Sequence, residues 1–131
     1  GTGGTITGTA RYLREKNPAV TIVGAEPVDS PLITRGISGP HGIQGIGANF
    51  IPKILDTQLY DSVIPVTEAD AYAAGRLLGT TEGILAGISS GAALHAATLL
   101  ANEPQNHGKT IVVLLPDSGE RYLSVPGFAE Q

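Results

Sequence analysis

The first five residues of the chain, GTGGT, combine three glycines with two hydroxyl side chains and lead into a predicted helix. Without bulky side chains, their backbone N–H groups can approach an anion, and the positive end of the helix dipole favours negative charge there. A third glycine of a dinucleotide-binding loop would fall at Ile6, and Gly8 is followed by Thr9 where a P-loop has Lys. The segment therefore predicts either a phosphate-binding loop without a cation or a plain glycine-rich turn.

A second motif, GISSG at residues 87–91, has the letters of the nucleophile elbow of α/β-hydrolases and lies between a predicted strand and a predicted helix. Such hydrolases place an acid and then a His after the Ser. Here the last suitable acid, Asp117, has no His behind it, because His95 and His107 both precede it. The pattern disfavours a serine hydrolase, and its alternative is a helix start capped by a Ser side chain.

Two other polar positions are weaker candidates. His41 lies in a long loop with no second His and no carboxylate beside it in the sequence, so we expect a surface residue and no metal site. Residues 117–122 gather polar groups just after a predicted buried strand, at the end of a sheet where α/β proteins bind ligands. The alternative for them is a solvated turn in which Glu120 and Arg121 face water.

Composition excludes several classes of function. The 131 residues are enough for about one domain. The net charge is −4 and the basic residues form no large cluster, which argues against nucleic acid as a partner. The absence of Cys excludes disulfides, thiolate zinc sites and a Cys nucleophile, and the longest apolar stretch, residues 111–115, is too short to cross a bilayer. We expect a cytoplasmic protein without membrane contact.

The elements that would position these motifs alternate between strands and helices. Strands alternating with helices of this length predict an α/β fold, with a mainly parallel sheet and flanking helices. Thr67, three residues before Asp70, predicts a capped helix start. The predicted elements are a helix at 6–16, a strand at 20–25, a loop at 27–49, a strand at 62–66, a helix at 68–78, a strand at 84–86, a turn at 87–91, a helix at 92–101 and a strand at 110–115.

Four stretches together resemble the cysteine synthase (O-acetylserine sulfhydrylase) family, in that family's order and spacing. They are residues 1–5, residues 39–41 (GPH) with residues 43–48 (IQGIGA), residues 82–93 (EGILAGISSGAA) and residues 119–124 (GERYLS). The resemblance implies a pyridoxal-phosphate enzyme of the tryptophan-synthase β-like fold. Its implied activity is a β-replacement that converts O-acetyl-L-serine and sulfide to L-cysteine and acetate.

The resemblance also implies roles for individual residues. Ser89 would hydrogen-bond the pyridine nitrogen of pyridoxal 5'-phosphate, and a neutral hydroxyl there would leave that nitrogen largely unprotonated. Gly45 and Gly47 would lie beside the substrate, where the absence of side chains lets the backbone approach. The cofactor phosphate would be held by Gly1, Thr2, Gly3, Gly4 and Thr5.

Some family features are absent from this sequence. In the family, the Schiff-base Lys and the loop that binds the substrate carboxylate lie upstream of the phosphate loop, and none of Lys16, Lys53 and Lys109 matches the Lys motif. Residues 1–131 are therefore expected to be the C-terminal part of such an enzyme, mostly its cofactor-phosphate-binding large domain. We expect no catalytic residue and no activity in this part alone. Gly42 stands where many relatives have a basic residue, and Asn49 stands where Gly is usual.

Other functions remain open at this stage. A split or decayed copy could bind a phosphate ligand, or a partner such as the C-terminal tail of serine acetyltransferase, without catalysis. A cystathionine β-synthase-like enzyme shares the fold and cofactor, but residues 119–124 favour cysteine synthase. By resemblance, the full-length enzyme is expected to be a homodimer.

Overall fold

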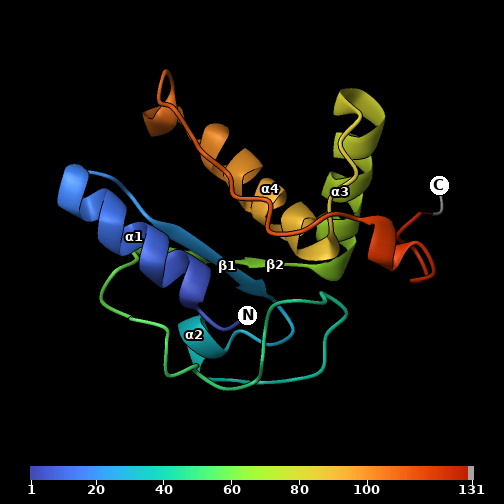
Figure 1. Ribbon diagram of the computed structural model, residues 1–131, viewed down its shortest axis with the longest axis horizontal. Helices are drawn as coiled ribbons and strands as arrows, with labels where there is room; N and C mark the ends of the chain where they lie inside the picture. Colours follow the sequence, from blue (N-terminus) through green and yellow to red (C-terminus); the bar gives the residue numbers. More distant parts are fainter. Residues whose placement is uncertain (130–131) are drawn as a thin grey trace.

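The computed structural model describes residues 1–129, which form a small parallel sheet flanked by helices (Figure 1). Strands β1 (Val23–Pro27) and β2 (Ser62–Val66) pair in parallel, with Val23 opposite Ser62 and Pro27 opposite Val66. The predicted α/β class with a parallel sheet is confirmed. The helices are α1 (Gly4–Lys16), α2 (Leu32–Arg35), α3 (Glu68–Glu82) and α4 (Ile88–Ala101), with short 3-10 helices at Pro104–Asn106 and Glu120–Tyr122. Among residues 1–129, no helix has the length and apolar character needed to cross a membrane.

Helix α1 begins directly after the glycine-rich segment, as the sequence predicts. Gly3 takes a left-handed conformation with φ of 83° at the helix start, and Thr7 and Ala10 are buried. The helix ends where the Asn17 N–H donates to the Leu13 carbonyl, one residue before Pro18. Pro disfavours the helical conformation of the residue that precedes it, which accounts for the end at this point.

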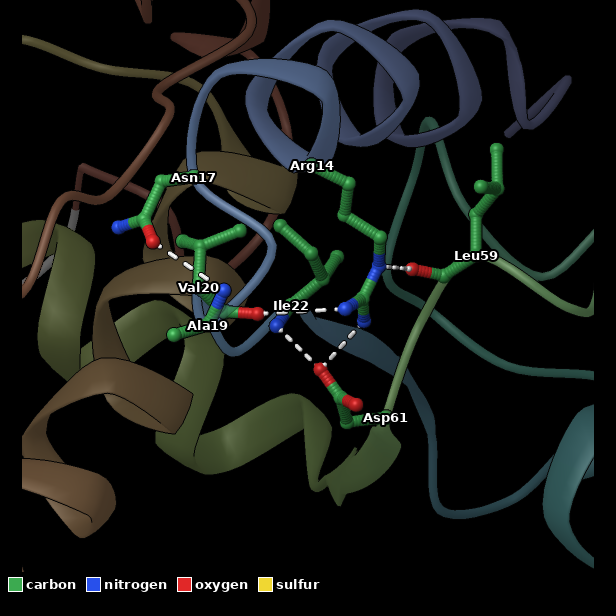
Figure 2. Close-up of polar contacts among 7 residues, drawn as sticks. All are labelled: Arg14, Asn17, Ala19, Val20, Ile22, Leu59 and Asp61. Atoms are coloured by element: carbon green, nitrogen blue, oxygen red, sulfur yellow. Dashed lines mark hydrogen bonds and ion pairs between the residues drawn. The ribbon is translucent and has the colours of Figure 1, made fainter.

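Polar contacts join the end of α1 to the start of the sheet (Figure 2). The Arg14 guanidinium donates to the Leu59 carbonyl at 2.9 Å and to Asp61 Oδ2 at 2.7 Å. A third, longer bond of 3.4 Å reaches the Val20 carbonyl, and the Ile22 N–H donates to Asp61 Oδ2 at 2.7 Å. These bonds lie just before β1, which begins at Val23 rather than at the predicted residue 20.

Helix α3 starts as predicted and ends later. The Thr67 hydroxyl accepts from the Asp70 N–H at 3.0 Å, which confirms the predicted cap. The helix continues to Glu82, four residues beyond the prediction, because its terminating residue is Gly83 at φ of 70°. A glycine in the left-handed conformation is the usual helix stop.

The core lies where α3 and α4 pack together beside the sheet. A Cβ at Gly91 would overlap the Ala71 carbonyl oxygen, so the two helices approach each other closely at a position that admits no side chain. Buried residues of both helices, of the sheet, of the loop before β2 and of the C-terminal segment form one cluster. Its members are Ile43, Val66, Ala71, Ile88, Ala92, Ala96, Tyr122 and Phe128.

Several predicted elements differ in the structure. Helix α4 begins at Ile88, so residues 88–91 form its first turn, and the capping residue is Gly87 without a side-chain bond, which makes the predicted Ser cap wrong. Residues 84–86 contribute only one antiparallel bridge, from Ala86 to Ser118, rather than a strand. The loop predicted at 27–49 contains the short helix α2.

The predicted strand at residues 110–115 is also not assigned as a strand. Within the described part of the chain, the segment has no neighbouring strand with which to pair, and Val112 is 89% exposed. Strand pairing requires a partner, and an apolar segment without one leaves its backbone groups and side chains uncovered. The local sequence was therefore not sufficient to predict this element.

Candidate functional site

The glycine-rich start of the chain, loop 41–47 and the start of α4 meet at the carboxyl ends of the two strands. A Cβ built on Gly1 would lie 2.7 Å from the Gly45 carbonyl oxygen, and one built on Gly45 would lie 3.3 Å from Ser89 Oγ. Gly47 is adjacent to Pro27, the last residue of β1. The candidate residues that the sequence predicted from three separate stretches are therefore neighbours, at the end of the sheet where α/β proteins bind ligands.

The first turn of α1 presents backbone donors at this site. The Gly4 N–H donates to Thr2 Oγ1 at 3.2 Å, whereas the N–H groups of Thr5 and Ile6 have no acceptor among residues 1–129. Free N–H groups at a helix start bind anions, as described for phosphate sites in general. At Gly4, an added Cβ would have only a few neighbours in the described chain, Thr2 Oγ1 at 3.3 Å being the nearest. The loop thus has the donors and the open space that a phosphate group requires.

Gly3 is constrained by a different contact. A Cβ at this position would lie 2.6 Å from the Leu55 Cβ, and the φ of 83° is itself unfavourable for residues with a side chain. The chain therefore requires glycine at position 3 for its own packing, whether or not a ligand is bound.

Ser89 lies in the first turn of α4 and borders the same cleft. Its side chain is largely buried, with 8% of the residue exposed, and its hydroxyl makes no hydrogen bond within residues 1–129. The neighbouring Ser90 hydroxyl instead donates to the Asp117 carbonyl at 3.3 Å. Of the two adjacent serines, only Ser89 is therefore left with a hydroxyl available to a ligand.

The cleft has a volume of about 1330 Å³ and extends beyond these residues. Its lining includes Gly1, Thr2, Gly3 and Thr5 at the glycine-rich segment, Gly45, Gly47 and Ser89, and much of residues 109–117. Small-molecule pockets usually have volumes of roughly 300–1,000 Å³. The cleft is therefore larger than one small ligand requires.

His41 differs from its sequence-based expectation. It is partly buried, and its ring bonds twice within the loop: Nδ1 accepts the Ile43 N–H at 3.1 Å, and Nε2 lies 2.8 Å from the Gly47 carbonyl oxygen. The prediction of a surface residue was wrong because the loop folds back on the ring. The sequence signal that could have predicted this fold-back is the pair of glycines Gly45 and Gly47, which both adopt positive φ.

Residues 117–122 form a packed corner rather than a simple solvated turn. The buried Tyr122 donates its hydroxyl to Asp117 Oδ2 at 2.5 Å and packs edge-on against Phe128. This hydrogen bond is the main cause of a raised pKa of the Tyr122 phenol, with burial adding to it. Asp117 Oδ1 is buried without a partner in the described chain. Glu120 and Arg121 are exposed, as the solvated-turn interpretation predicted.

The three lysines do not gather at this site. Lys16 lies in the last turn of α1 with its amino group over the Tyr12 ring, Lys53 lies in a turn, and Lys109 borders the cleft outside any helix or strand. No group of three His, Asp or Glu side chains among residues 1–129 could hold a metal ion.

Comparison with known proteins agrees with this geometry. The profile of the pyridoxal-phosphate dependent enzyme family matches residues 1–117. A cysteine synthase of Staphylococcus aureus is 50% identical over 126 residues, which are 96% of this chain and 40% of the relative. The crystal structure of cysteine synthase from Entamoeba histolytica superposes with a TM-score of 0.96 at 44% identity, covering 100% of this chain and 39% of that one.

A third relative is the O-acetylserine dependent cystathionine β-synthase from Helicobacter pylori, with a TM-score of 0.84 and 39% identity over 95% of this chain and 40% of its own. This chain thus spans about two fifths of the length of the relatives that it matches. Because the family profile covers most of the sequence, this chain belongs to the pyridoxal-phosphate dependent enzyme family.

Proposed function

We propose that this chain is the C-terminal part of a cysteine synthase, which makes L-cysteine and acetate from O-acetyl-L-serine and sulfide when an N-terminal part completes it. The observation that carries the proposal is the unpartnered Ser89 hydroxyl, next to Gly45 and in the same cleft as the glycine-rich loop. Identities of 50% and 44% to two cysteine synthases support this activity over that of the cystathionine β-synthase-like alternative, at 39%.

The glycine-rich loop would bind the phosphate of pyridoxal 5'-phosphate. The free N–H groups of Thr5 and Ile6 and the positive end of α1 favour a doubly charged anion, and no cation is required. The open space at Gly4 lets phosphate oxygens reach the backbone. These residues bind and orient the cofactor but take no part in proton transfer.

The Ser89 hydroxyl would donate to the pyridine nitrogen. When bound, the cofactor withdraws electrons from the substrate, so that the β-substituent of the substrate can leave and be replaced. A neutral hydroxyl does not hold a proton on the ring nitrogen as a carboxylate would, which makes the ring a weaker electron sink. That suits an elimination in which the departing acetate takes the electron pair.

Loop 41–47 would form the wall beside the substrate. Gly45 and Gly47 have positive φ values of 98° and 66° and border the cleft. At these two positions the bare backbone can approach the substrate, whereas a side chain would occupy the space.

The rest of the cleft would receive the N-terminal part of the enzyme. Residues 110–114 line it with a mostly exposed segment outside any helix or strand, and the cleft is larger than a cofactor needs. We propose that an N-terminal part supplies both the strands that cover this segment and the Schiff-base Lys. Residues 1–131 would then belong mostly to the large, phosphate-binding domain.

The proposal can be tested by complementation. The chain is mixed, or fused, with the N-terminal three fifths of the Staphylococcus aureus relative, and cofactor absorbance and cysteine production are measured. We expect both only in the complemented protein, and not in either part alone. Complemented protein that binds cofactor without making cysteine would instead support a non-catalytic module.

Two adjacent serines supply a matched pair of variants in the complemented protein. We expect Ser89→Ala to retain cofactor but to slow cysteine formation about fivefold, since one hydrogen bond is worth roughly 1 kcal/mol. Ser90→Ala removes a bond to the Asp117 carbonyl instead, so it should lower stability and leave the rate nearly unchanged. Equal rates for the two variants would contradict the role given to Ser89.

A further inference from the structure

Loop 41–47 is held by side chains rather than by its own backbone. Apart from a turn at Gln44–Gly45, residues 37–51 have no regular backbone structure, and no backbone–backbone hydrogen bond of good geometry involves them within the described structure. Ile43 anchors the loop in the core with 1% exposure, and the Tyr72 hydroxyl donates to the Gly42 carbonyl at 3.2 Å. These contacts fix only the first half of the loop, and Gly45 and Gly47, which border the cleft, lie beyond them.

The His41 ring joins the two halves. Because Nδ1 accepts the Ile43 N–H, it carries no proton, and Nε2 must carry the proton that it donates to the Gly47 carbonyl. The ring is therefore neutral and in a single tautomer. The Gly47 Cα is enclosed between this ring and Pro27, so that a side chain there would overlap both.

We propose that His41 is a positioning residue, which closes loop 41–47 through Gly47 and thereby holds Gly45 against Ser89 beside the substrate. This inference rests on the proposed cysteine synthase function. His41 itself does not border the cleft, so it acts through the backbone of Gly45 and Gly47. Breaking the bond to Gly47 should therefore widen the substrate position and leave the phosphate loop intact.

Two substitutions separate the two ring bonds. In His41→Gln, the amide NH₂ can occupy the place of Nε2 and still donate to Gly47. In His41→Asn, the amide oxygen can occupy the place of Nδ1 and still accept from Ile43, but nothing reaches Gly47. The Asn variant is thus the one that opens the loop, and the Gln variant is the rescue.

The variants are measured in the complemented protein loaded with pyridoxal 5'-phosphate. We expect His41→Asn to raise KM for O-acetylserine about tenfold, with little change in kcat or in cofactor content. His41→Gln should stay within about twofold of the parent in KM. His107→Asn, at an exposed position away from the loop, is the control and should match the parent. Equal KM values for the Asn and Gln variants would overturn the proposal, as would parallel losses of kcat, cofactor and melting temperature.

A second readout does not depend on activity. Nitrogen-15 NMR of the complemented protein should show a protonated Nε2 and an unprotonated Nδ1 for His41. Amide exchange at Gly45 and Ile46 should accelerate in His41→Asn and not in His41→Gln. If the parent makes no cysteine but these signals hold, the proposed function fails while the loop closure stands. A protonated Nδ1 in the parent, or equal exchange in both variants, refutes the closure whatever the activity.

Discussion

The two ends of the β1–β2 sheet differ in how their polar groups are satisfied. At the amino ends, Arg14 and Asp61 bind each other and neighbouring backbone groups, as Figure 2 shows. At the carboxyl ends, the N–H groups of Thr5 and Ile6 and the hydroxyl of Ser89 find no partner within residues 1–129. The chain thus completes its bonding at one end and leaves donors free at the other.

The difference separates stability from function. A polar network that is complete within the chain contributes to folding, while free donors at a helix start contribute only when a ligand arrives. Substitutions at the amino ends should therefore change the free energy of unfolding and leave ligand affinity alone. Substitutions at the carboxyl ends should do the reverse, except where the chain's own packing intervenes.

The largest effect on stability is expected at Gly3, where the chain's own packing intervenes in this way. Gly3→Ala should lower the free energy of unfolding by about 3 kcal/mol, since it combines an unfavourable positive φ with overlap against Leu55. Urea titration followed by circular dichroism measures the loss. Gly36→Ala is the control, because Gly36 has a φ of 70° but no atom of residues 1–129 lies within 4 Å of an added Cβ. If both variants lose the same amount, the Leu55 contact is unimportant.

Arg14→Ala should have the second largest effect and lower the free energy of unfolding by about 2 kcal/mol. The substitution removes three hydrogen bonds and the half-buried side chain that joins α1 to the sheet. Arg11→Ala should cost less than about 0.5 kcal/mol, since Arg11 is exposed and lies 3.8 Å from Asp56. Cofactor affinity of the complemented protein should be unchanged in both. A weakened affinity in Arg14→Ala would show that the two ends of the sheet are coupled.

Asp61→Asn should lower the free energy of unfolding at neutral pH, since it removes the charge that binds Arg14. The loss should be only about 1 kcal/mol, because the carboxylate is partly exposed. The Ile22 N–H, and then Arg14, hold the pKa of Asp61 below its ordinary value. The stabilisation is therefore complete above that ordinary value and is lost as the pH falls through the lowered pKa. Urea titrations from pH 6 to pH 2 should show the parent and the variant converging at low pH. A constant difference would mean that the Asp61 charge is not involved, and exposed Glu15→Gln serves as the control.

The smallest effect on stability is expected at Gly4, where the effect on the ligand should be large. In Gly4→Ala the added methyl group would lie 3.3 Å from Thr2 Oγ1, a tight contact with an exposed side chain, while alanine replaces glycine in a helix, so the two effects on stability should nearly cancel. Its methyl group would occupy the phosphate space, and cofactor affinity of the complemented protein should fall at least tenfold. Gly8→Ala, one turn later with nothing within 4 Å, should leave affinity intact. Equal affinities in a fluorescence titration would place the phosphate elsewhere.

Elements with local signals were predictable from the sequence. The Thr67 cap and the strand at 62–66 were located correctly, and α1 was predicted to within two residues, because caps, Pro and apolar periodicity act within a few residues. The strands at 84–86 and 110–115 were not, since a strand depends on a distant partner. The two ring contacts of His41 were missed because they depend on two glycine conformations that bring Gly47 back to the ring.

The corner at Asp117 restricts the order in which this sequence can change over generations. A side chain at Gly87 would overlap the Asp117 carboxylate, although the two residues are far apart in the sequence. A lineage could therefore accept a larger residue at position 87 only after Asp117 had been replaced by something shorter, and Tyr122 would then lose its acceptor. Among homologous sequences, a larger residue at position 87 should therefore occur only together with a shorter residue at position 117.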